Sequence, residues 1–319
     1  MRLVGKLMMV AVLAVALMMP AVAQAEYPDK PITYTIPFNP GGESDITARL
    51  QEPNLEKLLG VPVNVTHKPG GGGGVAWSAF QRTAKPTGYD LIGVNIPHII
   101  GQPMIRKDAG FKTDGFKVVI WFHFTPNALT VPAKSKFKTL KDFVEFAKKN
   151  PKAVTVGGSG TYSANHLELL NLEKAAGIQA TYIPHKGTGP LKPALLGGHI
   201  EAVMNYTMLP VELKDQVRVL AVASEKRHPM LPDAPTFKEL GYDIVGGAFR
   251  GVAVPLGTPQ PIVDKLADAF SKANTMIKDK QEPLGFFQTF HTGDDAVALI
   301  GQMRKNYIKV LEDIAAKKK

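Results

Sequence analysis

Two segments of the sequence place glycines and hydroxyl side chains between an apolar stretch and a helical stretch. The first is TIPFNPGGESD, residues 35–45, and the second is VGGSGTYSANH, residues 156–166. Glycine permits backbone angles that other residues resist, and the free N–H groups and dipole of a helix N-terminus favour an anion. An ordinary strand-to-helix turn uses the same residue types. Two such loops facing each other across a cleft would nevertheless hold one carboxylate from both sides.

Residues with free backbone N–H groups or polar side chains, in these loops and at nearby strand ends, are candidates to contact such an anion. They are Gly41, Gly42, Ser44, Ser159, Thr161, Ser163, Asn165, His166, Asn95, His98, Lys186 and Tyr206. Several have a simpler explanation. Asn95 and His98 could form a structural turn, and Lys186 could be an ordinary solvated lysine. His166 could be a packed or solvent-facing helix residue.

Patterns typical of catalysis and of cofactor binding are missing from the sequence. There is no cysteine, no Gly-x-Ser-x-Gly and no His-Glu-x-x-His. The run Pro69–Gly74 lacks the Gly-Lys-Ser/Thr ending of a phosphate loop. By composition it could be a flexible linker, but its place between a strand and a helix predicts a close-approach loop. We therefore expect no enzymatic activity, no cofactor and no metal.

The N-terminus has the pattern of a secretory signal peptide. Arg2 and Lys6 precede an apolar run, residues 7–19, and Ala23-Gln24-Ala25 forms a small-x-small cleavage site. The alternative is a membrane anchor, but the run is shorter than the roughly 20 residues that span a bilayer. We expect cleavage after Ala25 and export to the periplasm, with residues 1–25 taking no part in the fold.

The net charge of +10 is spread along the chain. No basic helix face with interleaved aromatic residues is visible, so nucleic-acid binding is a poor interpretation. A mild positive field would favour anionic small molecules, although solubility alone could explain it.

Apolar stretches and helical stretches alternate along the chain in two series. The predicted strands are 33–38, 61–66, 89–94, 154–157, 180–183, 200–205 and 217–223, and the predicted helices are 44–59, 75–83, 140–150, 163–177 and 191–196. Such βαβαβ series predict parallel sheets covered by helices. Two further strands end in Val-Pro, at 128–135 and 251–259, and are placed to cross between two lobes. We expect lobe 1 to comprise 26–127 plus 253–319, with C-terminal helices packed on it, and lobe 2 to comprise 128–252.

An ordered set of segments resembles one family. It comprises YPDKPITYTIPFNPGGESDITARL, KPGGGGGVAWSA, GYDLIGVN, GGSGTYSANHL, YIPHKGTGPLKPALLGGHIEAV, LPDAPTFKELGYDI and GVAVPLGTP. The chain resembles the substrate-binding proteins of tripartite tricarboxylate transporters, the TctC or Bug family. The resemblance implies a type II periplasmic-binding-protein fold, two Rossmann-like α/β lobes joined by two crossing strands. It also implies a monomer that delivers a carboxylate to membrane permease subunits.

In this family the two loops pin one carboxylate of the ligand. The resemblance carries that role to Phe38, Asn39, Gly41, Gly42, Glu43 and Ser44, and to Ser159, Gly160, Thr161 and Ser163. Glu43 departs from the family pattern, because an acid beside an anion is unfavourable unless it points outward, meets a cation or is protonated. It could instead face an amine or hydroxyl of the ligand. Arg250, near the expected cleft mouth, could make a bidentate carboxylate contact.

The extra polar groups favour a polar, multiply charged ligand such as citrate over an aromatic acid. An amino-acid-like or aromatic carboxylate remains an alternative ligand, and presentation of ligand to a membrane kinase an alternative role. A secreted enzyme of the same fold is disfavoured by the missing catalytic patterns.

Overall fold

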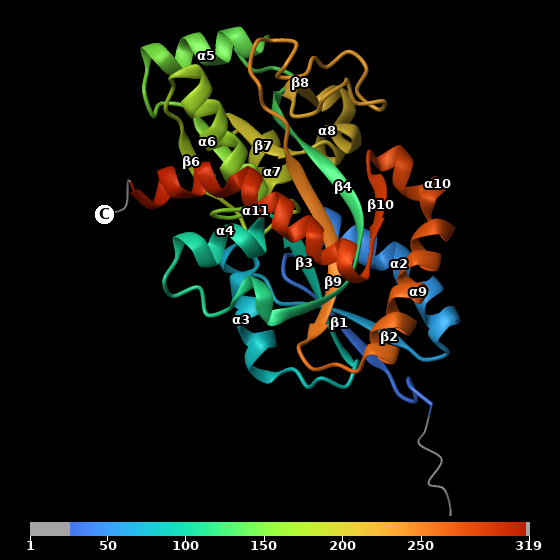
Figure 1. Ribbon diagram of the computed structural model, residues 1–319. Coiled ribbons are helices and arrows are strands. Elements are labelled where there is room, and N and C mark those ends of the chain that lie inside the picture. The colour runs from blue at the N-terminus through green and yellow to red at the C-terminus, as the bar shows by residue number, and fades with distance from the viewer. Residues whose placement is uncertain (1–25, 317–319) are drawn as a thin grey trace, which may run out of the picture.

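The computed structural model describes residues 26–316, and the predicted signal peptide and its cleavage site lie outside the described residues. In the lower half of Figure 1, three parallel strands form the sheet of the first lobe in the order β2-β1-β3. Its strands are β1 (Ile32–Ile36), β2 (Val63–His67) and β3 (Asp90–Ile96), and its helices are α2 (Glu43–Leu59), α3 (Gly74–Thr83) and α4 (His98–Ile105). Alternating buried side chains of β1 place Ile32, Tyr34 and Ile36 in the core of this lobe.

The second lobe repeats this arrangement in the upper half of Figure 1. Its strands are β5 (Thr155–Gly158), β6 (Thr181–Pro184), β7 (Ala202–Tyr206) and β8 (Val217–Val222), and its helices are α5 (Leu140–Lys149), α6 (Ala164–Ala176), α7 (Leu191–Leu196) and α8 (Met208–Leu213). The strand β5 lies between β6 and β7 and is parallel to both. In each lobe, therefore, the first strand is central and the strand order reverses beside it.

Two long antiparallel strands join the lobes. They are β4 (Phe116–Pro132) and β9 (Gly247–Pro255), which pair from Phe116↔Pro255 to Pro126↔Gly247. The strand β9 also pairs with β3 of the first lobe, and β4 pairs with β7 and β8 of the second. Sequence analysis placed the first crossing strand at 128–135, but β4 begins already at Phe116 because its early part pairs with β9. The predicted lobe boundaries fall inside these strands and stay a prediction.

The C-terminal segment closes the fold. It comprises α9 (Gln260–Met276), α10 (Lys278–Gln281), β10 (Phe287–His291) and α11 (Gly293–Ala316), with short 3-10 turns at Gly71–Gly73, Thr113–Gly115, Lys214–Gln216 and Glu282–Leu284. As predicted, α9 packs on α2 of the first lobe. By contrast, α11 lies across the junction of the two lobes (Figure 1) and contacts both α4 and α6. Its Tyr307 is buried in the same apolar cluster as Leu167 of α6.

The helix starts follow the local sequence. Ser163, as the N-cap of α6, accepts a hydrogen bond from the backbone N–H of His166, and Gly177 ends the helix in the left-handed conformation. Pro53 lies inside α2, and the helix continues beyond it. Within residues 26–316, no helix combines the length and the apolar character needed to span a bilayer.

Candidate functional site

The two predicted loops meet between the lobes. The first loop follows β1 and leads into α2, whereas the second follows β5 and leads into α6. Both loops therefore leave the central strand of a 2-1-3 sheet, at the carboxyl edge where open α/β sheets bind ligands. The glycine run of the first lobe contacts the second loop, since a Cβ on Gly160 would lie 2.5 Å from Gly72 Cα. The position of Pro69–Gly74 between a strand and a helix predicted such a close approach.

A small polar cavity lies at this junction. It measures about 10 Å³, which is room for about one water molecule. Its lining is drawn from both lobes and from β9, and comprises Phe38, Gly42, Glu43, Ser44, Asn95, Ser159, Gly187, Thr188, Tyr206 and Arg250. Eight of these ten residues were predicted as site residues. Gly187 and Thr188 were missed, although they belong to the PHKGTG segment from which only Lys186 was chosen.

Glu43 and Arg250 form an ion pair inside this cavity. Oε2 of Glu43 meets Nη2 of Arg250, and the two residues are only 2% and 3% exposed. Nη1 of Arg250 donates to Oγ1 of Thr125 at 3.1 Å. Both carboxylate oxygens of Glu43 and Nε of Arg250 are buried without an aligned hydrogen-bond partner. Sequence analysis listed a cation among the conditions that would tolerate Glu43, and Arg250 is that cation. It also placed Arg250 at the cleft mouth, whereas the guanidinium lies inside.

The environment of the pair shifts several ionisation equilibria. Burial raises the pKa of Glu43 to about 7, and Arg250 opposes this shift. Burial, reinforced by the positive charge of Arg250, lowers the pKa of His98 to about 3. Burial raises the pKa of Tyr206 to about 12. Near neutral pH, His98 and Tyr206 are therefore uncharged, and Glu43 is the group of these three that titrates.

A hydrogen-bond network orients the polar wall of the second lobe. Ser159 donates through its backbone N–H and its hydroxyl to Oδ1 of Asn165, at 2.9 and 2.5 Å. Nδ2 of Asn165 donates to Oδ1 of Asn127 at 2.8 Å. The hydroxyl of Tyr206 lies 3.4 Å from Oγ of Ser159 and 3.3 Å from Nε2 of His98. Asn165 and His98 therefore position cavity residues and do not themselves line the cavity.

Other predicted residues of the first loop lie beside the cavity. The N–H of Gly41 donates to Oδ2 of Asp45 at 2.8 Å, and the carbonyl of Gly41 accepts from Lys192. The N–H of Asn39 donates to the carbonyl of Lys186 at 2.9 Å, which ties the first loop to the second lobe.

Predicted residues of the second loop are also used within the protein. The carbonyl of Gly160 accepts from the hydroxyl of Tyr182, and the Ser163 hydroxyl caps α6. The ring of His166 stacks on that of Tyr182 with centroids 4.1 Å apart. This stacking is what the alternative of a packed helix residue predicts for His166. Its role in ligand binding stays a prediction.

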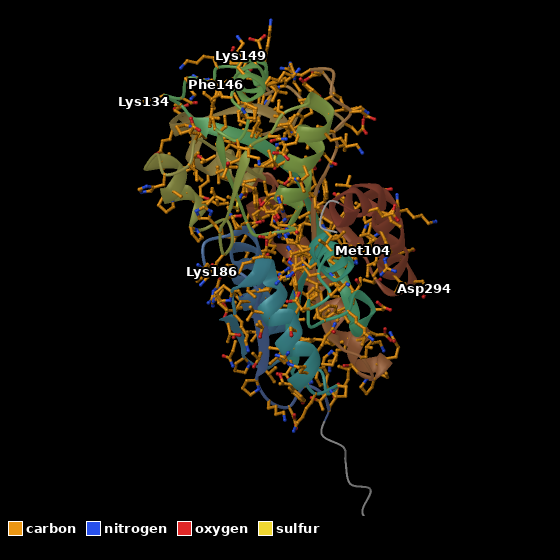
Figure 2. All side chains as sticks on the ribbon, turned by 90° about the vertical axis from the view of Figure 1, so that its left-hand side faces the viewer. Met104, Lys134, Phe146, Lys149, Lys186 and Asp294 are labelled. Atoms are coloured by element: carbon orange, nitrogen blue, oxygen red, sulfur yellow. The ribbon has the colours of Figure 1, made fainter. Side chains whose placement is uncertain are left out.

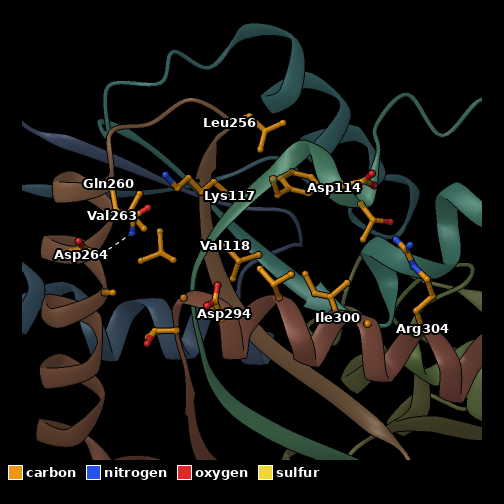
Figure 3. A pocket seen from close by; sticks show the side chains of 18 residues that line it. Asp114, Lys117, Val118, Leu256, Gln260, Val263, Asp264, Asp294, Ile300 and Arg304 are labelled. Atoms are coloured by element: carbon orange, nitrogen blue, oxygen red, sulfur yellow. Dashed lines mark hydrogen bonds between the residues drawn. The ribbon is translucent and has the colours of Figure 1, made fainter.

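Larger hollows lie outside the cavity. Thr161 and Lys186 line an outer depression of about 470 Å³ with Gly72 and Arg106, and Figure 2 shows Lys186 at the outside of the lobe junction. A groove of about 980 Å³ lies between β4, α9 and α11 (Figure 3), with Val118 and Ile300 among its apolar residues. No group of three or more His, Cys, Asp or Glu side chains that could hold a metal occurs among the described residues.

Residues 47–286 match the tripartite tricarboxylate transporter family receptor, TctC. The chain belongs to this receptor family. It is 38% identical over 260 residues to the "UPF0065 protein in gbd 5'region" of Cupriavidus necator, covering 81% of this chain and 79% of that protein.

Two solved structures share this fold. One is BugD, with a TM-score of 0.81, 28% identity, and coverage of 90% of this chain and 97% of BugD. The other is MatC from Rhodopseudomonas palustris with bound malate, with a TM-score of 0.82, 26% identity, and coverage of 91% and 100%. The two-lobe fold expected from the sequence is thereby confirmed.

Proposed function

We propose that this TctC-family protein is a periplasmic solute-binding protein. In this proposal it captures a small di- or tricarboxylate between its lobes, acts as a monomer, and delivers the ligand to the membrane permease subunits of a tripartite tricarboxylate transporter. The observation that carries the proposal is the cavity between the loops that follow β1 and β5. Ser44, Ser159 and Arg250 all line this cavity. Hydroxyl groups and a buried guanidinium are donors that suit carboxylate oxygens.

The size of the cavity bears on how a ligand enters. Its volume of about 10 Å³ is too small for any dicarboxylate. Binding therefore requires the lobes to separate, and β4 and β9 are the strands about which such a hinge motion would occur. The relative MatC, whose structure contains malate, supports a ligand of that size class.

Citrate remains one of the predicted ligands, but it is no longer the favoured one. The prediction of a multiply charged ligand requires Arg250 to be a cation available to that ligand. Because Glu43 already pairs with Arg250, the cavity supplies less net positive charge than that argument assumed. We therefore place C4 dicarboxylates first.

A thermal-shift screen of the purified protein tests this function. The ligands should include succinate, malate, citrate, benzoate, glutamate and a neutral sugar. A ligand at about 100 times its Kd should stabilise the folded protein by about 2.7 kcal/mol. We expect dicarboxylates to raise the melting temperature and the sugar to leave it unchanged. A shift with the sugar and with no carboxylate would contradict the proposal.

A further inference from the structure

The polar cavity already contains a carboxylate supplied by the protein. Glu43 enters from the first turn of α2, and Arg250 enters from β9. Their ion pair is almost fully buried. A ligand carboxylate that reaches Arg250 must therefore share the guanidinium with Glu43 or replace Glu43 there.

The geometry of Tyr206 indicates which ligands reach that far. Its hydroxyl lies 3.4 Å from Oγ of Ser159, and its ring face lies 4.3 Å from the central carbon of the Arg250 guanidinium. One tyrosine side chain thus spans the distance between the loop end of the cavity and Arg250. A carboxylate held by Ser159 leaves a second carboxylate of a C4 acid close to Arg250, whereas a short monocarboxylate has no group there.

Two carboxylates at one buried guanidinium repel each other, and protonation of one of them removes the repulsion. The groups that face the pair are Thr125 on β4, His98 on α4, Lys192 on α7 and Tyr206 on β7, while His123 of β4 is buried near Arg250. Arg250, Thr125 and Lys192 all favour the charged form of Glu43.

The two histidines cannot supply the missing positive charge. Burial lowers the pKa of His98 to about 3, and burial also lowers the pKa of His123 well below its usual value. Burial raises the pKa of Glu43 to about 7, so this carboxyl accepts a proton more readily than any ligand carboxylate in water. Once protonated, it becomes a hydrogen-bond donor to the ligand.

We propose that Glu43 makes ligand binding proton-linked: a dicarboxylate binds with uptake of one proton from solvent onto Glu43, whereas a monocarboxylate binds without it. This inference rests on the proposed carboxylate-binding function. With Glu43 protonated, Arg250 pairs with one carboxylate of the ligand. The cleft then does not carry the additional negative charge of Glu43.

Isothermal titration calorimetry tests this proposal. Succinate and propionate are titrated into the protein at pH 8, in phosphate and in Tris, whose ionisation enthalpies differ. We expect the buffers to report uptake of about 0.9 proton per succinate and none per propionate. Succinate affinity should fall by up to about tenfold per pH unit above pH 7.

Two variants assign the proton to its residue. In Glu43→Gln, succinate should bind without proton uptake and with an affinity that is flat between pH 7 and 8.5. Glu52→Gln, on a half-buried acid of the same helix that lies outside the cavity and pairs with Arg49, should behave like the wild type.

The possible outcomes separate this inference from the proposed function. Binding of succinate without proton uptake, or with uptake that survives in Glu43→Gln, would overturn the inference and leave the function standing. If no carboxylate binds at any pH, both proposals fail. The wild-type comparison of succinate with propionate decides the matter even if the Gln variant does not fold.

Discussion

Gly160 of the second lobe packs against Gly72 of the first, so closely that a Cβ on Gly160 would lie 2.5 Å from Gly72 Cα. Both residues also have positive φ angles, of 123° and 64°. The closed arrangement of the lobes therefore depends on two positions that have no side chain.

This contact predicts the effect of Gly160→Ala on ligand binding. The added methyl group should hold the lobes apart and weaken carboxylate binding by at least about tenfold, which corresponds to about 1.4 kcal/mol. Gly198→Ala is the matched control, because Gly198 also has a positive φ of 73° but no atom near its Cβ position. Titration calorimetry should show a loss of affinity in the first variant alone. Equal affinities would show that the Gly72 contact does not control closure.

The Glu43–Arg250 pair predicts a strong coupling between the two residues. Arg250→Met leaves a buried carboxylate without its cation, so at pH 8 it should lower the free energy of unfolding by about 3–5 kcal/mol. The double variant Glu43→Gln/Arg250→Met should recover much of that loss. Urea unfolding measures both values.

Arg49→Met removes an exposed cation that pairs with Glu52 and Asp45, and it should cost at most about 1 kcal/mol. If the effects of the Glu43 and Arg250 substitutions simply add, the buried pair is not a coupled unit.

The raised pKa of Glu43 predicts how stability changes with pH. Because the pKa of this carboxyl is about 7 in the folded protein against 4.5 ordinarily, the folded state binds more protons than the unfolded state between these values. The contribution of Glu43 to stability is therefore present below pH 4.5 and lost as the pH rises towards 7. The total loss is about 3 kcal/mol.

The measurement compares wild type with Glu43→Gln in urea at pH 5, 6, 7 and 8. The comparison is needed because the lowered pKa of His98 acts in the opposite direction between pH 3 and 6.5. Stability of the variant relative to wild type should rise from pH 5 to pH 7 and then level off. A difference that stays constant with pH would place the titration elsewhere.

Ser159 and Thr161 should differ in their effects, although the family resemblance assigned both the same role. Ser159 lines the cavity, whereas Thr161 lines the outer depression. Ser159→Ala should weaken monocarboxylates and dicarboxylates alike, by about fivefold to tenfold, through the loss of the hydroxyl that lines the cavity. Thr161→Ala should leave affinity within about twofold. Calorimetric titration of both variants with succinate and propionate checks this, and equal losses would contradict the position assigned to Thr161.

The sequence by itself determined the local units of this protein. Apolar periodicity and turn residues predicted both βαβαβ series, and the glycine and hydroxyl residues after β1 and β5 marked the two loops that meet at the cavity. These features can be predicted from the sequence because strand pleat, helix period and capping by residues such as Ser163 depend on residues that are close together in the chain.

Only the tertiary structure decided how the polar side chains are used. Glu43 meets Arg250, Asn165 is occupied by Ser159 and Asn127, and α11 spans both lobes. Each of these contacts joins residues or elements that the chain brings together only after its strands have paired. The charge state of Glu43 follows from burial and from Arg250 on β9, and neither of these is a property of the helix start in which Glu43 stands.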